Sequence, residues 1–379
     1  MISVPLGELT TLVMGQAPAG KDCNKEGQGT PFVKAGEFSE RFPIIREWTT
    51  SPKKHAKKGD VLVCVVGATA GKVNDAIDCA IGRSVAAVRP NTDVLDHGYI
   101  YRFMQLQTAS LRSEAQGMAQ GVITREMINR LEIPLPPLEE QKRIAGILDQ
   151  AAELCRLRTR ALEKLNTLGQ AIFHEMFGDL RDNSEEWKTK PIDEVCEAMV
   201  DCVNRTAPVV DGPTPWRMIR TTNVRHGVVN LDTVRYVEEV TFERWNRRLT
   251  PRPGDVLLTR EAPVGEVGVL RENGVFLGQR LFLYRPNPDI MSPEFLSYQM
   301  MSPYFSLQFS QSGSGSTVKH LPLPACQSFE VRVPPIARQK AFDAAVNALT
   351  VEESRLRRSL ECAKKLFASL QHCAFRGEL

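Results

Sequence analysis

The sequence predicts an α+β fold in which two pseudo-symmetric mixed α/β domains are separated by two long antiparallel helices forming an intramolecular coiled coil. Three observations lead to this prediction: a set of motifs that occurs twice, short apolar runs bounded by turn residues, and a heptad pattern that closes each copy. The 379 residues suit two or three domains of ordinary size, and 42% hydrophobic residues with a net charge of +3 argue against disorder.

The internal repeat is an ordered series of short motifs whose offset drifts only from 186 to 198 residues. Pro5–Leu9 recurs as Pro191–Val195, Gly59–Leu62 as Gly254–Leu257, Arg89–Asn91 as Arg285–Asn287, and Pro136–Pro137 with Gln141–Lys142 as Pro334–Pro335 with Gln339–Lys340. Because the order is kept while the offset changes slowly, we interpret the chain as one unit written twice, with small loop insertions in the second copy.

Each copy begins with a globular part, predicted at residues 1–137 and 191–335. The apolar runs Val61–Val66 and Val256–Thr259 predict buried strands, because they are short and bounded by turn residues. The helical stretches predicted further along are Asp96–Ser110 and Pro293–Gln308.

A long helix closes each copy, predicted at 138–177 and 336–375, with a polar linker at 178–190. The apolar residues of both helices step by three and four, which is the pattern of a helix that packs along another helix. Two such helices in one chain favour an intramolecular pair, antiparallel if a pseudo-twofold axis relates the copies. A coiled coil between two chains is the alternative.

The polar residues of this seam allow a prediction of register. If the two helices are centred on each other, Arg158 lies near Ser354 and within reach of Glu352, and an ion pair there would fix the register. The alternative is that both side chains extend to solvent.

Several classes of function are excluded by the sequence. It has no run of about 18 apolar residues and no secretory leader at its start, so we expect a cytoplasmic protein without membrane spans. The nine cysteines form no C-x-x-C pair and do not cluster with the six histidines, which argues against a disulfide framework or a zinc site. Gly67–Lys72 resembles a phosphate-binding loop but has three residues between its glycines instead of four, so we interpret it as a tight turn. We found no catalytic or metal-binding constellation and therefore expect no enzyme activity.

The small net charge conceals two basic segments at matching places of the repeat. Arg41–Asp60 holds six basic residues against two acids, and Arg217–Arg252 holds eight arginines against four acids, which gives each a local charge of +4. Arginine, lysine and asparagine interleaved with aromatic residues suit contacts to DNA phosphates and bases. A solvated basic face is the alternative for each segment.

The helices would also hold two such units apart. A helix of about 36 residues spans roughly 54 Å, and duplex DNA advances about 3.4 Å per step. Two units on such a spacer could contact sites about one helical turn apart. Because the units differ between their shared motifs, we expect a bipartite, asymmetric target.

The residues at the helix ends resemble those of a known family. Ile133–Leu148 is similar to the start of the central helix in specificity (S) subunits of type I restriction–modification systems, and Phe173–Asp179 resembles the end of that helix. Val333–Lys340 and Ala374–Leu379 resemble the ends of the C-terminal helix, although Ile336-Ala-Arg-Gln replaces the more usual Leu-Glu-Glu-Gln. Gly59–Leu62, Gly254–Leu257 and Gly278–Arg280 are similar to landmarks of target recognition domains.

The resemblance implies a non-catalytic subunit with two target recognition domains, each reading half of a split double-stranded DNA sequence. It further implies two methyltransferase (M) subunits that use S-adenosylmethionine to methylate adenine. Motor–nuclease (R) subunits that use ATP and Mg²⁺ would join them for restriction, and this chain would hold no cofactor. The rival interpretation is a coiled-coil adaptor that does not read DNA sequence.

The residues predicted to contact DNA come from turns, the basic segments and glycine-rich loops of both copies. They are Lys34, Lys53, Lys54, Lys72, Arg83, Ser84, Thr124 and Arg125 in the first copy, and Arg220, Thr222, Asn223, Arg260, Arg280 and Lys319 in the second. An exposed charge without base contact is the alternative for each of them.

Overall fold

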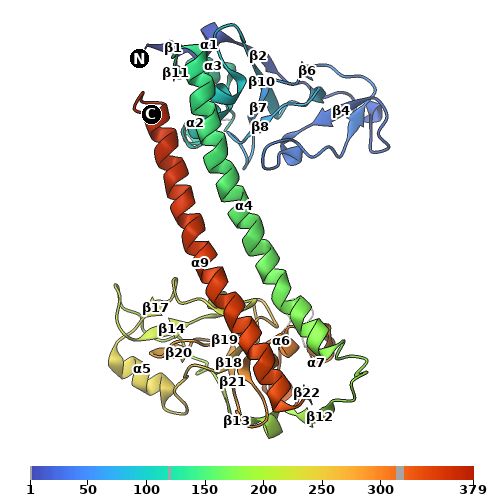
Figure 1. The fold of residues 1–379 in the computed structure, drawn as a ribbon, viewed down its shortest axis with the longest axis vertical. Helices are drawn as coiled ribbons and strands as arrows, with labels where there is room; N and C mark the ends of the chain where they lie inside the picture. The colour runs from blue at the N-terminus through green and yellow to red at the C-terminus, as the bar shows by residue number, and fades with distance from the viewer. Residues whose placement is uncertain (1, 118–120, 313–319) are drawn as a thin grey trace. The chain divides into compact units, whose positions relative to one another are not determined.

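The computed structural model describes residues 2–117, 121–312 and 320–379. It divides into two compact units, which are described separately. Unit 1 comprises Met1–Arg160 with Arg357–Leu379, and unit 2 comprises Ala161–Leu356 (Figure 1). Each unit therefore contains one globular part together with a portion of both long helices.

Unit 1 is built on a four-stranded antiparallel sheet of order β2-β10-β7-β8, next to a five-stranded sheet of order β3-β5-β4-β9-β6 and the pair β1-β11. Its strands are β1 (Ser3–Pro5), β2 (Thr10–Met14), β3 (Cys23–Asn24), β4 (Thr30–Val33), β5 (Trp48–Thr49), β6 (His55–Ala56), β7 (Val61–Cys64), β8 (Val73–Asp75), β9 (Cys79–Ile81), β10 (Val85–Pro90) and β11 (Glu132–Pro134). Its shorter helices are α1 (Leu6–Leu9), α2 (His97–Gln116) and α3 (Arg125–Asn129), with 3-10 turns η1 (Gly20–Asp22) and η2 (Ala35–Glu37).

Unit 2 repeats the plan with a six-stranded sheet of order β13-β21-β18-β19-β16-β15, a three-stranded sheet β17-β14-β20 and the pair β12-β22. Its strands are β12 (Lys188–Pro191), β13 (Cys196–Asp201), β14 (Arg217–Ile219), β15 (Val224–Arg225), β16 (Gly227–Val229), β17 (Arg235–Tyr236), β18 (Val256–Thr259), β19 (Val267–Val269), β20 (Val275–Leu277), β21 (Leu281–Pro286) and β22 (Glu330–Val333). Its shorter helices are α5 (Glu239–Asn246), α6 (Pro293–Met300), α7 (Pro303–Ser312) and α8 (Leu323–Gln327), with 3-10 turns η3 (Ile192–Val195) and η4 (Thr221–Asn223).

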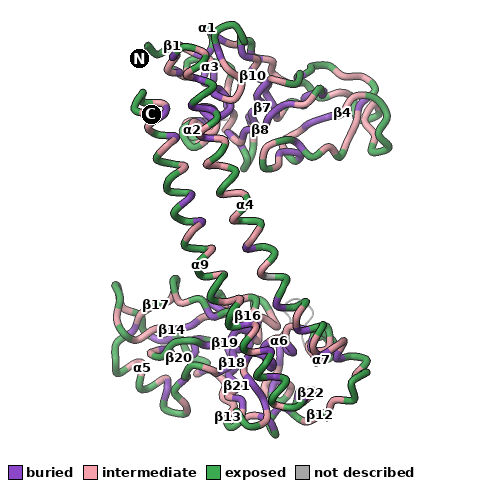
Figure 2. Tube along the Cα trace, in the orientation of Figure 1, coloured by how far each residue is buried: buried purple, intermediate pink, exposed green. Residues whose placement is uncertain are grey.

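The predicted buried strands are apolar without alternation because both of their faces are covered. Side chains of β7 alternate between two cores: Val61 and Val63 pack in the cluster that includes α2, whereas Leu62 packs against the five-stranded sheet. Strand β18 does the same in unit 2, where Val256 and Leu257 belong to different clusters. Figure 2 shows this burial around β7 and β18. The central sheets are thus rigid supports for the loops at their edges.

The repeated Gly-Asp-Val-Leu and Arg-Pro-Asn motifs meet in space. In unit 1 the buried carboxylate of Asp60 accepts hydrogen bonds from Nε and Nη2 of Arg89 at 2.8 and 2.7 Å. In unit 2, Asp255 accepts from Nε and Nη2 of Arg285, both at 2.8 Å. These motifs recur because they join neighbouring strands in the same way in both copies.

A second repeated residue ties each long helix to its globular part. The side chain of Gln141 accepts from the backbone N–H of Asp96 at 2.8 Å and donates to the carbonyl oxygens of Val94 and Pro136. Gln339 makes the corresponding bonds with Ser292, Ile290 and Pro334. Both glutamines are fully buried. We therefore interpret their presence in both copies as a structural requirement for attaching each long helix to its globular part.

The long helices α4 (Leu138–Phe177) and α9 (Ile336–Ala374) have almost the predicted bounds. Within unit 1 the guanidinium of Arg158, near the middle of α4, donates to the carbonyl oxygen of Ser359 in α9 at 2.7 Å. Arg143, near the start of α4, donates to the carbonyl oxygen of Leu379 beyond the end of α9 at 3.0 Å. Within unit 2, Phe173 and Phe177 pack on Phe342 with ring centroids 5.5 and 5.6 Å apart. In each unit the two helices therefore run in opposite directions.

Three predictions need correction. The contact of Arg158 lies five residues beyond the predicted neighbour Ser354, so the predicted register was shifted. The predicted helix Pro293–Gln308 is two helices, because the chain turns at Met301–Ser302 before Pro303. The predicted linker 178–190 packs on unit 2, where Leu180 is 2% exposed and strand β12 begins at Lys188.

None of the helices in the described residues is long and apolar enough to cross a lipid bilayer.

Candidate nucleic-acid interface

The loops at one edge of the unit 1 sheets are joined by backbone hydrogen bonds. At the start of turn η2, the N–H of Ala35 donates to Oγ of Ser84 at 3.1 Å. The N–H of Val65 donates to the carbonyl oxygen of Ser84, and the N–H of Ile123 donates to that of Val65, both at 2.9 Å. Four segments that are distant in sequence therefore meet at this edge, which carries six predicted residues: Lys34, Lys72, Arg83, Ser84, Thr124 and Arg125.

Unit 2 makes the same framework with different side chains. The N–H of Arg260 donates to the carbonyl oxygen of Arg280 at 2.9 Å, and the N–H of Leu321 donates to that of Arg260 at 3.0 Å. Turn η4 joins this edge through Thr221, whose hydroxyl lies 3.5 Å from the carbonyl oxygen of Ala262. By these bonds Arg260 stands where unit 1 has Val65, and Arg280 stands where unit 1 has Ser84.

The glycine that precedes the unit 2 loop is required by close packing. A Cβ added at Gly278 would lie 2.5 Å from the carbonyl oxygen of Ile219, which accepts a hydrogen bond from the N–H of Gly278 at 2.7 Å. No other residue fits so near a backbone. The Gly278–Arg280 landmark thus brings the β20–β21 loop against turn η4.

Four predicted residues of unit 1 have internal roles. Lys34 forms an ion pair with Glu47, whose hydrogen bond raises the pKa of the lysine. Nζ of Lys72 donates to the carbonyl oxygen of Phe38 at 3.1 Å. Thr124 caps helix α3 by accepting from the N–H of Met127, and Ser84 holds turn η2. These side chains shape the edge, and their contacts to DNA stay a prediction.

The other predicted residues of unit 1 are exposed cations. Lys53, Lys54 and Arg83 have no carboxylate partner among the described residues, although Nζ of Lys53 lies 3.3 Å from the hydroxyl of Ser51. The carbonyl oxygen of Lys54 accepts from the N–H of Ile81, which places this lysine beside the Gly82–Ser84 loop. Arg125 is exposed and also donates to the carbonyl oxygen of Leu12 at 2.9 Å. The structure therefore gathers free positive charge at this edge.

In unit 2 the structure argues against one predicted contact. Asn223 is 1% exposed, and its side chain accepts from the N–H of Arg220 and donates to the carbonyl oxygen of Asn230. Because its amide is buried and engaged, Asn223 stabilises turn η4 and does not face a base. Sequence alone does not distinguish this role, since asparagine serves both turns and adenine contacts.

The remaining predicted residues of unit 2 differ in their exposure and in whether their side chains have partners within the protein. Thr222 is exposed at the tip of turn η4. Arg260 donates to the carbonyl oxygen of Leu321, and Arg220 donates to that of Thr233 at 3.3 Å while its Nε is buried without a partner in the described chain. Arg280 is exposed and lies 3.0 Å from Glu261. Lys319 lies outside the described residues.

Gly67–Lys72, the sequence that resembles a phosphate loop, is a turn between strands β7 and β8. Both Gly67 and Gly71 have positive φ, and the N–H of Lys72 donates back to the carbonyl oxygen of Thr69 at 3.0 Å. The Cβ of any larger residue at Gly71 would lie 2.6 Å from the carbonyl oxygen of Thr108. This geometry agrees with the predicted tight turn.

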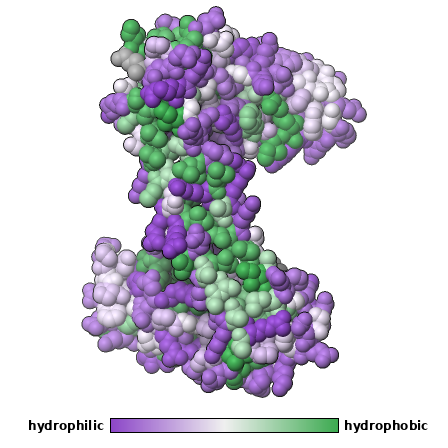
Figure 3. All heavy atoms as spheres, in the orientation of Figure 1, coloured by the Kyte–Doolittle hydropathy of each residue, from purple (hydrophilic) through white to green (hydrophobic). Residues whose placement is uncertain are grey.

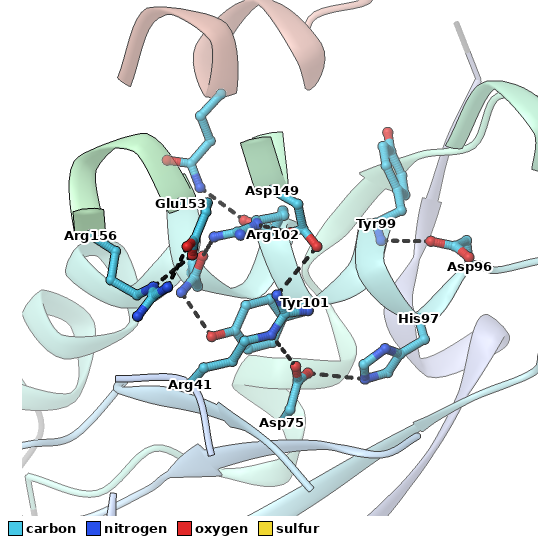
Figure 4. A network of polar contacts seen from close by, with 12 residues as sticks. Arg41, Asp75, Asp96, His97, Tyr99, Tyr101, Arg102, Asp149, Glu153 and Arg156 are labelled. Carbon is cyan, nitrogen blue, oxygen red and sulfur yellow. Dashed lines mark hydrogen bonds and ion pairs between the residues drawn. The ribbon is translucent and has the colours of Figure 1, made fainter. Parts of the chain in front are cut away.

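A partly buried polar network attaches the globular part of unit 1 to helix α4 (Figure 4). Arg41 lies between Asp75 and Asp149, at 2.7 and 3.3 Å, and Arg102 donates to Asp149 at 2.6 Å. His97, the first residue of α2, lies 3.1 Å from Asp75. Burial would raise the pKa of Asp75, but hydrogen bonds from His97 and Arg41 outweigh it and lower that pKa, while Asp75 raises the pKa of His97. This network could not be predicted from the sequence, because its members lie on four separate elements.

A groove of about 1150 Å³ opens beside this network in unit 1. Its walls combine the apolar side chains of Leu154, Leu157 and Phe367 with charged groups that include Arg102 and Asp149. Leu154 and Leu157 are 39% and 52% exposed. On the face drawn in Figure 3, apolar residues are exposed along the helices, whereas the residues exposed on the globular parts are mainly hydrophilic. The two kinds of surface suit different partners.

Two copies of one scaffold, each with a cationic edge of its own composition, define a protein with a duplicated recognition domain. A family model described as the type I restriction modification DNA specificity domain matches residues 2–167 and 184–346. The chain therefore belongs to this family and carries its domain twice, which confirms the resemblance to specificity subunits.

Relatives of known name agree with this assignment. The chain is 21% identical to the type I restriction enzyme MjaVIII specificity subunit of Methanocaldococcus jannaschii, over 97% of this chain and 91% of that protein. It is 22% identical to the EcoBI specificity subunit of Escherichia coli, over 82% of this chain and 72% of that protein.

Solved structures share the fold. The S subunit of a type I restriction–modification system from M. genitalium is similar with a TM-score of 0.61 at 15% identity, covering 99% of this chain and 96% of that one. A chain from a study of the assembly and conformational transition of a type I system gives a TM-score of 0.59 at 17% identity, with 100% and 98% covered.

Proposed function

We propose that each unit reads one half of a split DNA target, so that the whole target is bipartite and asymmetric. The observation that carries this proposal is the common backbone framework with different side chains at equivalent places. Val65 and Ser84 stand in unit 1 where Arg260 and Arg280 stand in unit 2. Val65 is 1% exposed and packs in the core, whereas Arg260 is partly exposed and Arg280 is exposed, so only the unit 2 edge presents guanidinium groups at these places. Since a guanidinium can fork onto guanine, the two edges are expected to select different bases.

The two long helices would act as the spacer between the half-sites, as an intramolecular antiparallel coiled coil. The spacing of apolar residues by three and four supports this, as does the opposite direction of α4 and α9 within each unit. A rod of this kind sets the unread gap by its length, because it resists bending more than a loop does.

The chemistry of methylation and cleavage would belong to partner subunits. Two M subunits would bring S-adenosylmethionine and methylate adenine, and R subunits would bring ATP and Mg²⁺, in the cytoplasm where the chromosome lies. DNA specificity domains account for most of this chain, and its sequence lacks catalytic motifs, which supports a non-catalytic role. Exposed Leu154, Leu157 and Leu366 offer an apolar surface on which a partner could pack.

The adaptor interpretation is not favoured, because both globular parts match a DNA specificity domain. An adaptor would need only the helices and would have no reason to keep two different edges on one framework.

Footprinting of the purified complex with its M subunits tests this function. We expect protection of two short tracts of different sequence with an unread gap between them, at both low and moderate salt. Sequence-independent binding that disappears as salt rises would contradict the proposal, because it would show only contacts to phosphates.

A further inference from the structure

A small pocket in unit 2 is lined mainly by arginine. It has a volume of about 220 Å³ and is formed by Val203, Arg205, Arg244, Trp245 and Arg247. Arg244 lies in the last turn of helix α5 and Arg247 follows its end, while Arg205 comes from the loop after strand β13. Arg244 and Arg247 belong to the basic segment Arg217–Arg252 but were not singled out as DNA contacts, and Arg205 lies outside that segment.

The positive charge around this pocket is not neutralised by the protein. Arg205, Arg244 and Arg247 are exposed and make no ion pair within the described part of the chain. Their neighbours differ, since Arg248 is paired with Asp201 at 2.6 Å and Arg252 with Glu197 at 3.0 Å. Three like charges around one hollow repel each other, so an anion bound there would be stabilised by all three.

Helix α5 holds its arginines on a firm base. Phe242 stacks on Trp216 with ring centroids 4.3 Å apart, and Trp245 packs 6.4 Å from Phe276. The buried side chain of Asn246 donates to the carbonyl oxygen of Val275 at 3.2 Å. Because the inner face of the helix is anchored in this way, its outer face presents Arg244 and Arg247 with little freedom of the backbone.

The pocket also adjoins the edge described above. The N–H of Arg280 donates to Sγ of Cys202 at 3.0 Å, and the N–H of Cys202 donates to the carbonyl oxygen of Leu281 at 3.1 Å. Arg205 follows three residues after Cys202 in the same loop. A duplex lying along the edge near Arg280 could therefore reach the arginine pocket with its backbone.

We propose that Arg205, Arg244 and Arg247 bind a backbone phosphate of the DNA that flanks the half-site of unit 2, and so position the duplex without reading a base. The inference rests on the proposed function. A guanidinium offers paired N–H donors that match phosphate oxygens. The guanidinium carbon of Arg244 lies 5.6 Å from the centroid of the Trp245 ring, and this contact helps to hold Arg244 beside the pocket. Unit 1 has no helix between β5 and β7, only the short strand β6, so this contact belongs to unit 2 alone.

A double-mutant cycle, which combines substitutions in the protein with neutral phosphates in the DNA and measures binding affinity, tests the site. The full-length chain in complex with its partner subunits is titrated with a duplex that carries its methylation target, and single phosphates in the flank of the unit 2 half-site are replaced by neutral methylphosphonate. For the natural protein we expect about a tenfold loss of affinity at one or two positions. R244Q/R247Q should lose about as much on unmodified DNA and nothing further at those positions.

Salt dependence and a matched variant give independent readouts. R244Q/R247Q should reduce the slope of log affinity against log salt by about 0.9, because the substitutions remove the contact to one phosphate. K188Q, which neutralises an exposed lysine on strand β12, should leave both the slope and the methylphosphonate pattern unchanged. The ratio of affinities for target and scrambled DNA should be preserved in all variants, because phosphate contacts carry no sequence information.

The proposal is overturned if R244Q/R247Q, with an unchanged melting curve, keeps the natural salt slope and remains sensitive at the same phosphates. It is also overturned if inorganic phosphate protects the natural protein from thermal unfolding through these arginines while the DNA cycle shows no coupling, since the site would then take free phosphate. A natural complex that does not distinguish target from scrambled DNA would instead refute the proposed function itself.

Discussion

At the scale of single residues, the motifs shared by the two units are internal ties, and the candidate DNA contacts are found where the units differ. Asp60 and Asp255 each accept two hydrogen bonds from an arginine on the neighbouring strand. Such pairs hold a strand end in place. They also bury a carboxylate, which would be strongly destabilising without its arginine partner. The two pairs differ in exposure, since Arg89 is 34% exposed and Arg285 is 12% exposed.

This difference predicts unequal effects of the same substitution. Arg285→Gln should lower the free energy of unfolding of unit 2 by about 3 kcal/mol, because it strands a fully buried carboxylate. Arg89→Gln should lower that of unit 1 by only about 1–2 kcal/mol, because Arg89 is itself more exposed and solvent already screens its interaction with Asp60. Urea unfolding followed by circular dichroism measures both, with Arg83→Gln as an exposed control. Equal losses at the two sites would contradict the argument.

The His97–Asp75 pair predicts a dependence of stability on pH. Its hydrogen bond to Asp75 raises the pKa of His97, although burial and the charge of Arg41 act against this. The folded protein therefore holds this proton more tightly, and the added stability is complete below the ordinary histidine pKa of about 6.5 and is lost as pH rises through the raised value. The lowered pKa of Asp75 matters only in acid, where stability is lost as pH falls through it.

We expect the free energy of unfolding of unit 1 to fall as pH rises from the ordinary histidine pKa of about 6.5 through the raised pKa of His97, and His97→Gln to flatten this slope. Urea unfolding at a series of pH values gives the comparison. An equal slope in the two proteins would show that His97 does not titrate against Asp75 in this range. Asp96 is the other acid that raises the pKa of His97, and it is unchanged in the variant.

At the scale of elements, the sequence predicted the long helices and central strands well, because heptad spacing and fully apolar runs depend on burial along one element. It did not predict the division between α6 and α7 or the packing of residues 178–190 on unit 2. It also missed helix α5, whose aromatic residues were read only as part of a basic segment. These features depend on contacts between elements, which no single stretch of sequence encodes.

Two glycines of helix α4 should respond oppositely to alanine. A Cβ at Gly146 would meet open space, whereas one at Gly169 would lie 2.1 Å from the hydroxyl oxygen of Tyr298. Gly146→Ala should therefore raise the free energy of unfolding by about 0.5–1 kcal/mol through helix propensity, while Gly169→Ala should lower it despite the same gain. Thermal unfolding compares them directly. A stabilised Gly169→Ala variant would show that the ring of Tyr298 moves aside freely.

At the scale of the whole molecule, duplication explains why a small net charge accompanies DNA reading. The same backbone framework occurs twice, each time with a cationic edge. Because the rest of the chain has a balanced number of acidic and basic residues, the net charge of the whole chain does not reveal these edges. The sequence predicted two basic segments and individual contact residues, but it could not show which of these side chains have internal partners. Asn223 is buried in its turn, and Lys34 and Thr124 have internal partners, because a turn needs the same polar groups as a DNA contact.

The central claim is that the two units read their half-sites independently. Exchange of residues 1–137 for the corresponding residues of another family member, followed by sequencing of the methylated sites in cells that express the complex, tests it most directly. We expect one half of the methylated sequence to change while the other half and the gap stay the same. A change in both halves, or in neither, would contradict it.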